Sequence, residues 1–170
     1  RDNTMHKTVA LTATVVLAIA GALGYHFATT PTQAPASSYV LLDGSTTDTS
    51  AFRGRVTLVN FWATSCVTCV AEMPRIVATH DKFNGRGYDT LAVAMQYDPP
   101  SYVVNFVETR KLPFRVAIDN TGAVAKAWGD IQLTPTTFVV NKHGEIVKRY
   151  VGEPDFTELH RLIERLLAES

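Results

Sequence analysis

The sequence predicts an α/β domain in which helices flank a mixed sheet. Over residues 39–170, runs of β-branched and aromatic residues alternate with segments whose apolar residues recur at helical spacing. Such alternation is typical of parallel strands joined by helices. Near the end of the chain, two strand patterns, TTFVVN and EIVKRYV, are separated only by the turn KHG. This spacing predicts an antiparallel hairpin beside the parallel strands.

The first half of the domain is expected to contain two strands and a helix. YVLL, residues 39–42, is the first strand, and the turn Asp43-Gly44 ends it. VTLVNFW, residues 56–62, is almost continuously apolar, which is typical of a strand buried on both faces. The apolar residues of VAEMPRIVATHDKF, residues 70–83, then follow a helical period. We expect Pro74 to kink this helix, because proline lacks a backbone N–H.

The second half repeats the strand and helix pattern. After the strand DTLAVAMQY comes a helix, PPSYVVNFVETRK, whose inward side chains are expected to be Val103, Val104, Phe106 and Val107. The remaining elements, in order, are a strand FRVAI, a small helix AVAKAW, the terminal hairpin and an amphipathic closing helix PDFTELHRLIERLLAE.

The N-terminus predicts export or attachment to a membrane. Met5 and Lys7 precede an uncharged, mostly apolar run over residues 8–27. A bilayer-spanning helix needs about 20 such residues, whereas the core of a cleaved signal peptide has about 7 to 15. We therefore favour a retained signal anchor over residues 1–27, with its N-terminus on the cytoplasmic side, and keep a cleaved signal peptide as the alternative. The residues before Met5, RDNT, are set aside as an artefact of cloning or of the assigned start codon.

Residues 28–38, ATTPTQAPASS, have the composition of a semi-extended linker, so the domain is expected over 39–170. The charge of the whole chain is balanced, because it has 16 basic and 16 acidic residues. No basic stripe is present that could follow the phosphates of a nucleic acid. We therefore expect no nucleic acid among its partners.

The only two cysteines, Cys66 and Cys69, lie where the buried strand gives way to the helix. Free N–H groups and the dipole at a helix start stabilise an anion, and cysteines placed there have pKa values of about 3.5 to 7.5. Cys66 is therefore predicted to attack a substrate disulfide, and Cys69, one turn later, to resolve the mixed disulfide. Glu72 follows on the same side of the helix and is positioned to exchange a proton with Cys69. The alternative for Glu72 is an ordinary solvated helix residue.

Metal binding is the main competing use of a cysteine pair. A structural zinc site needs about four ligands, and neither His80 nor His143 is part of a histidine pair. Two thiolates on an exported domain can also hold Cu(I), so a copper-handling dithiol protein remains the binding alternative. We expect no metal, and no cofactor apart from a redox-active disulfide between Cys66 and Cys69.

Two segments, NFWATSCVTCVAEMP and TPTTFVVNKHGEI, resemble the TlpA/ResA/DsbE-like branch of the thioredoxin fold. The resemblance covers about residues 39–167, and the strand and helix over 91–110 are similar to the central insertion of that family. It implies a thioredoxin fold and a membrane-anchored thiol:disulfide oxidoreductase.

The same resemblance implies a substrate-binding loop. Thr134-Pro135 corresponds to the family's cis-proline loop, which lies against the disulfide and pairs with the substrate. Trp62 is expected either in the core or on the active-site surface, and we include it with Thr134 and Pro135 in the substrate-binding set. Asn60 stands where cytoplasmic thioredoxins have a buried aspartate, which favours Glu72 as the proton carrier.

The resemblance further implies a location and partners. The location is the periplasmic side of a bacterial inner membrane. The partners are protein substrates, such as apocytochrome c or copper-delivery proteins, and a membrane thiol transporter that donates electrons. We expect mainly a reductant, with a thiol oxidant or isomerase as the alternative. Two departures leave the partner surface and the redox potential open. Ser65 replaces the tryptophan usual before the first cysteine, and Val67-Thr68 lacks both the histidine of strong oxidants and the usual proline.

Overall fold

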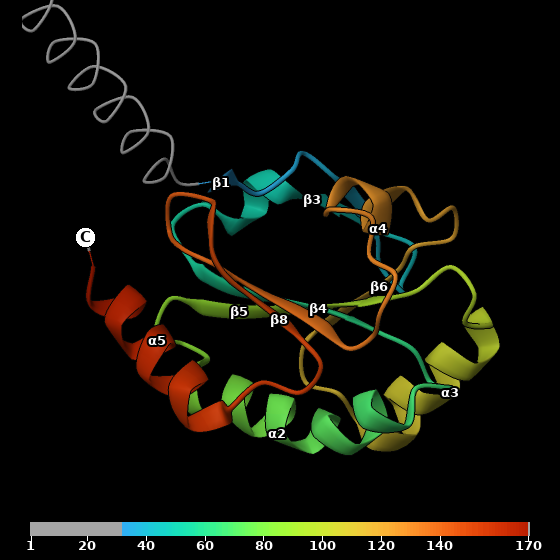
Figure 1. Cartoon of the computed structure of the whole chain (residues 1–170). Helices are drawn as coiled ribbons and strands as arrows, with labels where there is room; N and C mark the ends of the chain where they lie inside the picture. Colours follow the sequence, from blue (N-terminus) through green and yellow to red (C-terminus); the bar gives the residue numbers. More distant parts are fainter. Residues whose placement is uncertain (1–31, 170) are drawn as a thin grey trace, which may run out of the picture. The chain divides into compact units, whose positions relative to one another are not determined.

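The computed structural model describes residues 32–169, and its main feature is a six-stranded sheet. The strands, in spatial order, are β1 (Thr32–Gln33), β8 (Glu145–Val151), β7 (Thr136–Val140), β4 (Val56–Trp62), β5 (Tyr88–Ala94) and β6 (Arg115–Ile118) (Figure 1). Strands β4, β5 and β6 run parallel, whereas β7 is antiparallel to β4, and β8 to β7. The predicted mixed sheet and terminal hairpin are therefore confirmed.

Helices cover one face of this sheet, and smaller elements cover the other. On the first face lie α2 (Val67–Phe83), α3 (Pro100–Arg110) and α5 (Phe156–Ala168) (Figure 1). On the second face lie α4 (Ala123–Ala127), the 3₁₀ helix η1 (Thr49–Phe52) and a two-stranded sheet of β2 (Ser38–Val40) and β3 (Thr46–Asp48). This arrangement of helices about a mixed sheet is a thioredoxin fold.

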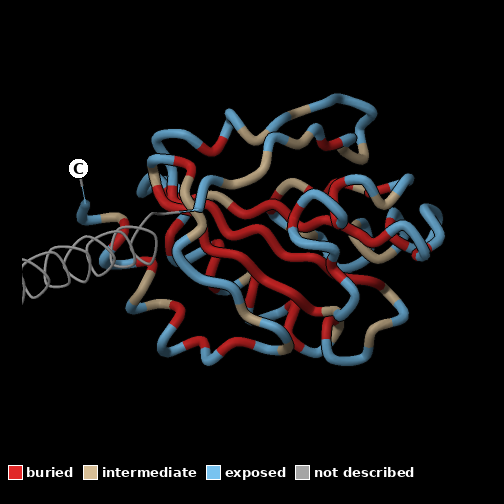
Figure 2. The backbone as a smooth tube through the Cα atoms, turned by 45° about the horizontal axis from the view of Figure 1, so that its top comes forward, coloured by how far each residue is buried: buried red, intermediate tan, exposed pale blue. Residues whose placement is uncertain are grey.

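The central strand β4 divides the core between the two faces. All of its residues are buried, as expected for a strand with neighbours on every side (Figure 2). Successive side chains of a strand point to opposite faces. Leu58 and Trp62 accordingly join the cluster under α2, α3 and α5, whereas Val59 and Phe61 pack with Trp128 after α4. Asn60 therefore points to the α2 side, where the candidate site lies.

Helix α2 runs without interruption from Val67 to Phe83, through Pro74. The inward face predicted for α3 is partly wrong: Val103 is buried and Phe106 and Val107 are partly buried, but Val104 is exposed. Val104 lies about 100° around the helix from Val103, on the side of α3 that is open to solvent.

The N-terminal boundary of the domain differs from the prediction. Thr32 and Gln33, expected in the linker over 28–38, form β1, which pairs with β8 opposite Ile146 and Glu145. Strand pairing uses backbone groups, so the small polar composition of this stretch did not reveal it. The predicted anchor over 1–27 lies outside the described residues. Within residues 32–169, no helix is both long and apolar enough to cross a membrane.

Candidate active site

A disulfide joins Cys66 and Cys69 at the start of α2, with the sulfur atoms 2.15 Å apart. Strand β4 ends at Trp62, and a short loop brings Cys66 to the N-cap position of the helix. Cys69, one turn inside the helix, is fully buried, whereas Cys66 keeps part of its surface. Only Cys66 is therefore open to a partner molecule, which agrees with the division of roles predicted from the sequence.

The helix start places one backbone donor against the Cys66 sulfur. The backbone N–H of Cys69 donates to Cys66 Sγ over 3.1 Å, so the sulfur takes the capping place that a serine or aspartate oxygen has in many helices. The positive end of the helix dipole lies at the same point. Both effects stabilise a negative charge on this sulfur once the disulfide is reduced.

The loop before β7 lies directly against the disulfide. The peptide bond between Thr134 and Pro135 is cis, and the carbonyl oxygen of Thr134 lies 3.5 Å from Cys66 Sγ. The register explains this contact, because Phe61 near the end of β4 pairs with Thr136 at the start of β7. Thr134 and Pro135 are thus at the site, as the resemblance implied.

Glu72 is buried behind the disulfide, one helical turn after Cys69. The amide of Asn60 donates to Glu72 Oε1 over 3.1 Å and to Thr137 Oγ1 over 2.9 Å. Burial raises the pKa of Glu72 to about 7, although the Asn60 hydrogen bond opposes the shift. Its second oxygen, Oε2, has no hydrogen-bond partner among residues 32–169. The alternative of a solvated helix glutamate is therefore wrong.

The expectation that Trp62 lines the active-site surface is also wrong. Its indole is fully buried, and the ring of Phe106 from α3 lies 5.1 Å from it, centre to centre. Trp62 is a core residue in the same buried cluster as Cys69, and its side chain cannot touch a substrate.

The loop between β5 and α3 adds two residues that the sequence analysis did not identify. The buried carboxylate of Asp98 accepts the N–H of Thr64 over 2.6 Å and the Thr64 hydroxyl over 2.5 Å. Next to it, the Tyr97 hydroxyl lies within hydrogen-bond distance of Thr134 Oγ1, at 3.2 Å. This single loop thus contacts both the segment before Cys66 and the cis-proline loop. No motif in the sequence signalled either contact.

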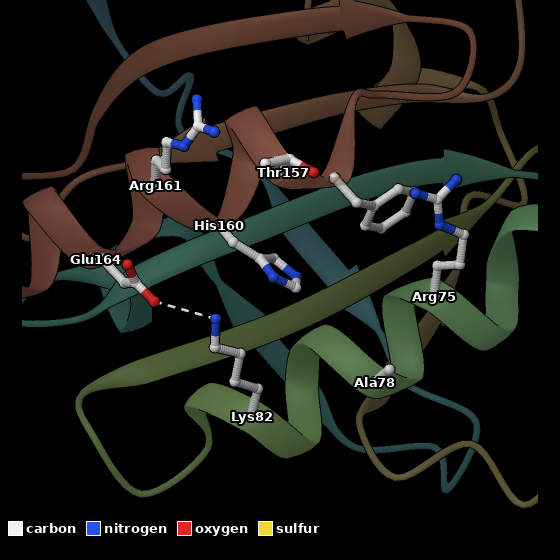
Figure 3. Close-up of a pocket in the computed structure, with 8 residues that line it drawn as sticks. Arg75, Ala78, Lys82, Thr157, His160, Arg161 and Glu164 are labelled. Atoms are coloured by element: carbon white, nitrogen blue, oxygen red, sulfur yellow. Dashed lines mark hydrogen bonds and ion pairs between the residues drawn. The ribbon is translucent and has the colours of Figure 1, made fainter.

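Neither a metal-binding cluster nor the hollow between α2 and α5 competes with the cysteine site. Among residues 32–169, no cluster of three or more histidine, cysteine or acidic side chains could hold a metal. A hollow of about 420 Å³ lies between α2 and α5 (Figure 3). Two of its cationic side chains are already paired, Lys82 with Glu164 and Arg75 with Glu153. We assign it no ligand.

Comparison with known proteins agrees with this geometry. A cysteine pair of this kind exchanges disulfides with other thiols, which is the chemistry of thiol:disulfide oxidoreductases. The family model described as Redoxin matches residues 29–163, and the chain belongs to this family.

Two relatives show the specific type. The thiol-disulfide oxidoreductase ResA of Geobacillus kaustophilus is 30% identical over 162 residues, which cover 89% of this chain and 92% of the relative. ResA of Bacillus thuringiensis subsp. konkukian is 31% identical over 125 residues, covering 74% and 71%. The protein is therefore a thiol:disulfide oxidoreductase of the ResA type.

Solved structures extend the likeness to three dimensions. A solution structure from Neisseria meningitidis, assigned to the thioredoxins, has a TM-score of 0.76 and 41% identity, and covers 82% of this chain and 93% of that one. A thiol:disulfide interchange protein from Chlorobium tepidum has a TM-score of 0.74 and 27% identity, covering 82% and 98%.

Proposed function

We propose that the protein is exported and reduces disulfides of particular proteins outside the cytoplasm. The observation that carries this proposal is the buried carboxyl of Glu72, held by Asn60 one turn after Cys69. Such a group supplies what the second cysteine of a reductant needs, which is a place for its proton when it becomes a nucleophile.

The reaction begins with the reduced dithiol. The Cys66 thiolate attacks one sulfur of the substrate disulfide, and the first substrate thiolate leaves. Cys69 then transfers its proton to the Glu72 carboxylate and attacks Cys66 Sγ, which releases the second substrate thiolate. Two electrons pass from the cysteine pair to the substrate, and the protein is left with the disulfide seen in the structure. No cofactor other than this disulfide is required.

The acidity of Glu72 suits this step. With a pKa raised to about 7, the carboxyl group is populated in both forms near neutral pH. It can therefore take the proton of Cys69 during substrate reduction and return it when the disulfide is reduced again. A carboxyl group of ordinary acidity would be a weaker base.

We further propose the setting of the reaction. The apolar run over residues 8–27 supports an anchor in the inner membrane with the domain in the periplasm, or secretion to the periplasm if the segment is cleaved. Apocytochrome c or copper-delivery proteins are the proposed substrates, and a membrane thiol transporter is the proposed electron donor.

The direction of electron flow is tested by equilibrating the protein with glutathione buffers. We expect a reduction potential closer to that of thioredoxin, about −270 mV, than to that of DsbA, about −120 mV. A value near the DsbA end would favour the oxidant alternative and contradict the proposed direction.

A further inference from the structure

Large apolar side chains are unusually exposed around the disulfide. Among residues 32–169, the four most exposed large hydrophobic residues include Val67 at 84%, Leu133 at 65% and Tyr97 at 57%. Val67 follows Cys66 in the chain, Leu133 precedes Thr134, and Tyr97 is within hydrogen-bond distance of Thr134. We call these three residues the apolar rim.

The apolar rim comes from three separate parts of the chain: the first residue of α2, the loop before β7 and the loop between β5 and α3. Single exposed apolar residues are common on protein surfaces, but a group of them around a reactive centre indicates a contact surface. Thr134 fixes the meeting point, because its carbonyl oxygen lies 3.5 Å from Cys66 Sγ. A molecule whose sulfur reaches Cys66 therefore approaches Thr134, next to which Leu133 lies in the chain and the Tyr97 hydroxyl lies in space.

Hydrogen bonds hold the Tyr97 side of the rim in place. The Tyr97 hydroxyl is 3.2 Å from Thr134 Oγ1, and the adjacent Asp98 carboxylate accepts two hydrogen bonds from Thr64. A surface loop that contacts both sides of the cysteine site in this way is preorganised. Preorganised contacts lose less conformational entropy when a partner binds.

We infer that Tyr97 and Leu133 are specificity-determining residues that select protein disulfides whose cysteine is flanked by apolar side chains. This inference rests on the proposed function in that the substrates are protein disulfides. Ser65, the residue before Cys66, provides no apolar surface, so the apolar surface near Cys66 comes from the rim. The occupant is therefore an extended segment with a cysteine and apolar neighbours, and charged or strongly polar neighbours are disfavoured.

Two synthetic peptides test the inference. Each contains one cysteine in mixed disulfide with thionitrobenzoate, and the cysteine is flanked by leucines in one peptide and by serines in the other. The Cys66 thiolate of the reduced protein attacks the peptide sulfur and releases coloured thionitrobenzoate. Cys69 then attacks Cys66 and releases the peptide thiol. The second-order rate constant is measured for both peptides.

The wild type should prefer the leucine peptide by about tenfold, the size expected for a few apolar contacts. In Tyr97→Ala and in Leu133→Ser, the two rate constants should lie within about twofold of each other, chiefly because the rate constant for the leucine peptide falls. Tyr97→Phe keeps the ring and should retain most of the preference. Val147→Ser, an exposed apolar residue on β8, is the matched control and should behave as the wild type.

The outcomes separate the inference from the proposed function. Equal rate constants for the two peptides in the wild type, or an unchanged ratio in Tyr97→Ala and Leu133→Ser, would overturn the inference alone. A reduced protein that releases thionitrobenzoate from neither peptide would contradict reduction of peptide disulfides itself. Circular dichroism of each variant shows whether a loss of rate comes from loss of fold.

Discussion

The side-chain amide of Asn60 on β4 donates a hydrogen bond to the carboxyl group of Glu72 on α2 over 3.1 Å, and both side chains are fully buried. The central strand thereby holds in place the carboxyl group that we propose as the proton carrier for Cys69. Because Asn60 is neutral, Asn60 and Glu72 together carry at most one negative charge. An aspartate in place of Asn60 would allow two. A proton can therefore be stored on Glu72 near neutral pH, where its pKa of about 7 lies.

Replacing Glu72 should change the chemistry of the cysteines. In Glu72→Gln, Oε1 can still accept from Asn60, but the variant has no carboxylate to repel a nearby thiolate or to accept a proton. We expect the thiolate absorbance titration of the reduced protein to shift to lower pH, and release of a mixed disulfide by Cys69 to slow by about 10²-fold or more. Superimposable titrations and equal release rates would show that Glu72 is not coupled to Cys69.

The same substitution should change how stability depends on pH. Folding raises the pKa of Glu72 from 4.5 to about 7, so the folded state binds the proton more tightly than the unfolded chain. This contribution to the free energy of unfolding is fully present below pH 4.5 and is lost as the pH rises to about 7. The shift corresponds to about 3 kcal/mol at most. In urea unfolding of the oxidised proteins, the free energy of unfolding of Glu72→Gln should rise relative to that of the wild type as the pH increases across this range. A difference between the two proteins that does not change with pH would contradict the raised pKa.

His80 should produce a pH dependence of the opposite sign. Burial beside Tyr88 and Phe114 lowers the pKa of His80 below 6.5, so the folded state favours the neutral ring. Stability from this residue is present above pH 6.5 and is lost as the pH falls through the lower, folded pKa.

The His80 effect is best measured in the Glu72→Gln background, which removes the competing titration. There, unfolding free energies from pH 7 to 5 should fall less steeply in His80→Phe than in the parent protein. Equal slopes in the two proteins would contradict the lowered pKa of His80.

Asp98 should protect the segment before Cys66. Without its carboxylate, the N–H of Thr64 loses its acceptor, so Asp98→Ala should lower stability by about 1 to 3 kcal/mol and speed amide hydrogen exchange at Thr64. Asp119, also buried, accepts the N–H of Ala125 away from the cysteines and provides the control. Asp119→Ala should also be destabilised, but faster exchange at Thr64 should occur only in Asp98→Ala. An unchanged Thr64 amide in Asp98→Ala would show that this hydrogen bond does not hold the loop.

Local patterns made part of this structure predictable. Strand β4 is an almost continuous apolar run, and the cysteines follow it closely, so the sequence places Cys66 at a helix start. The cis-proline loop came from family resemblance, because nothing local to TPTTF shows that it lies against Cys66. The burial of Glu72 was not predictable from the helix alone, since it depends on Asn60 of another element.

Apart from the orientation of Val104, the errors share one physical cause, which is contact between residues far apart in the chain. Trp62 is the last residue of its strand, a position from which a side chain can reach the surface, but Phe106 of α3 covers it. Thr32 and Gln33 have the composition of a linker and still pair with β8. Tyr97 ends the predicted strand DTLAVAMQY, but β5 stops at Ala94. Tyr97 and Asp98 lie in the loop that follows, and their partners lie in two other loops. Such contacts leave no periodic signal in the sequence.

The central claim is that Cys66 attacks and Cys69 resolves, and trapping experiments with single-cysteine variants test it most directly. Reduced Cys69→Ser and Cys66→Ser are each mixed with a protein disulfide, quenched with acid, and mapped by peptide mass spectrometry. Because Cys66 is accessible at the helix N-cap and Cys69 is buried, Cys69→Ser should accumulate a mixed disulfide through Cys66, and Cys66→Ser should remain unreacted. A mixed disulfide formed through Cys69 in Cys66→Ser, with Cys69→Ser unreactive, would contradict the account.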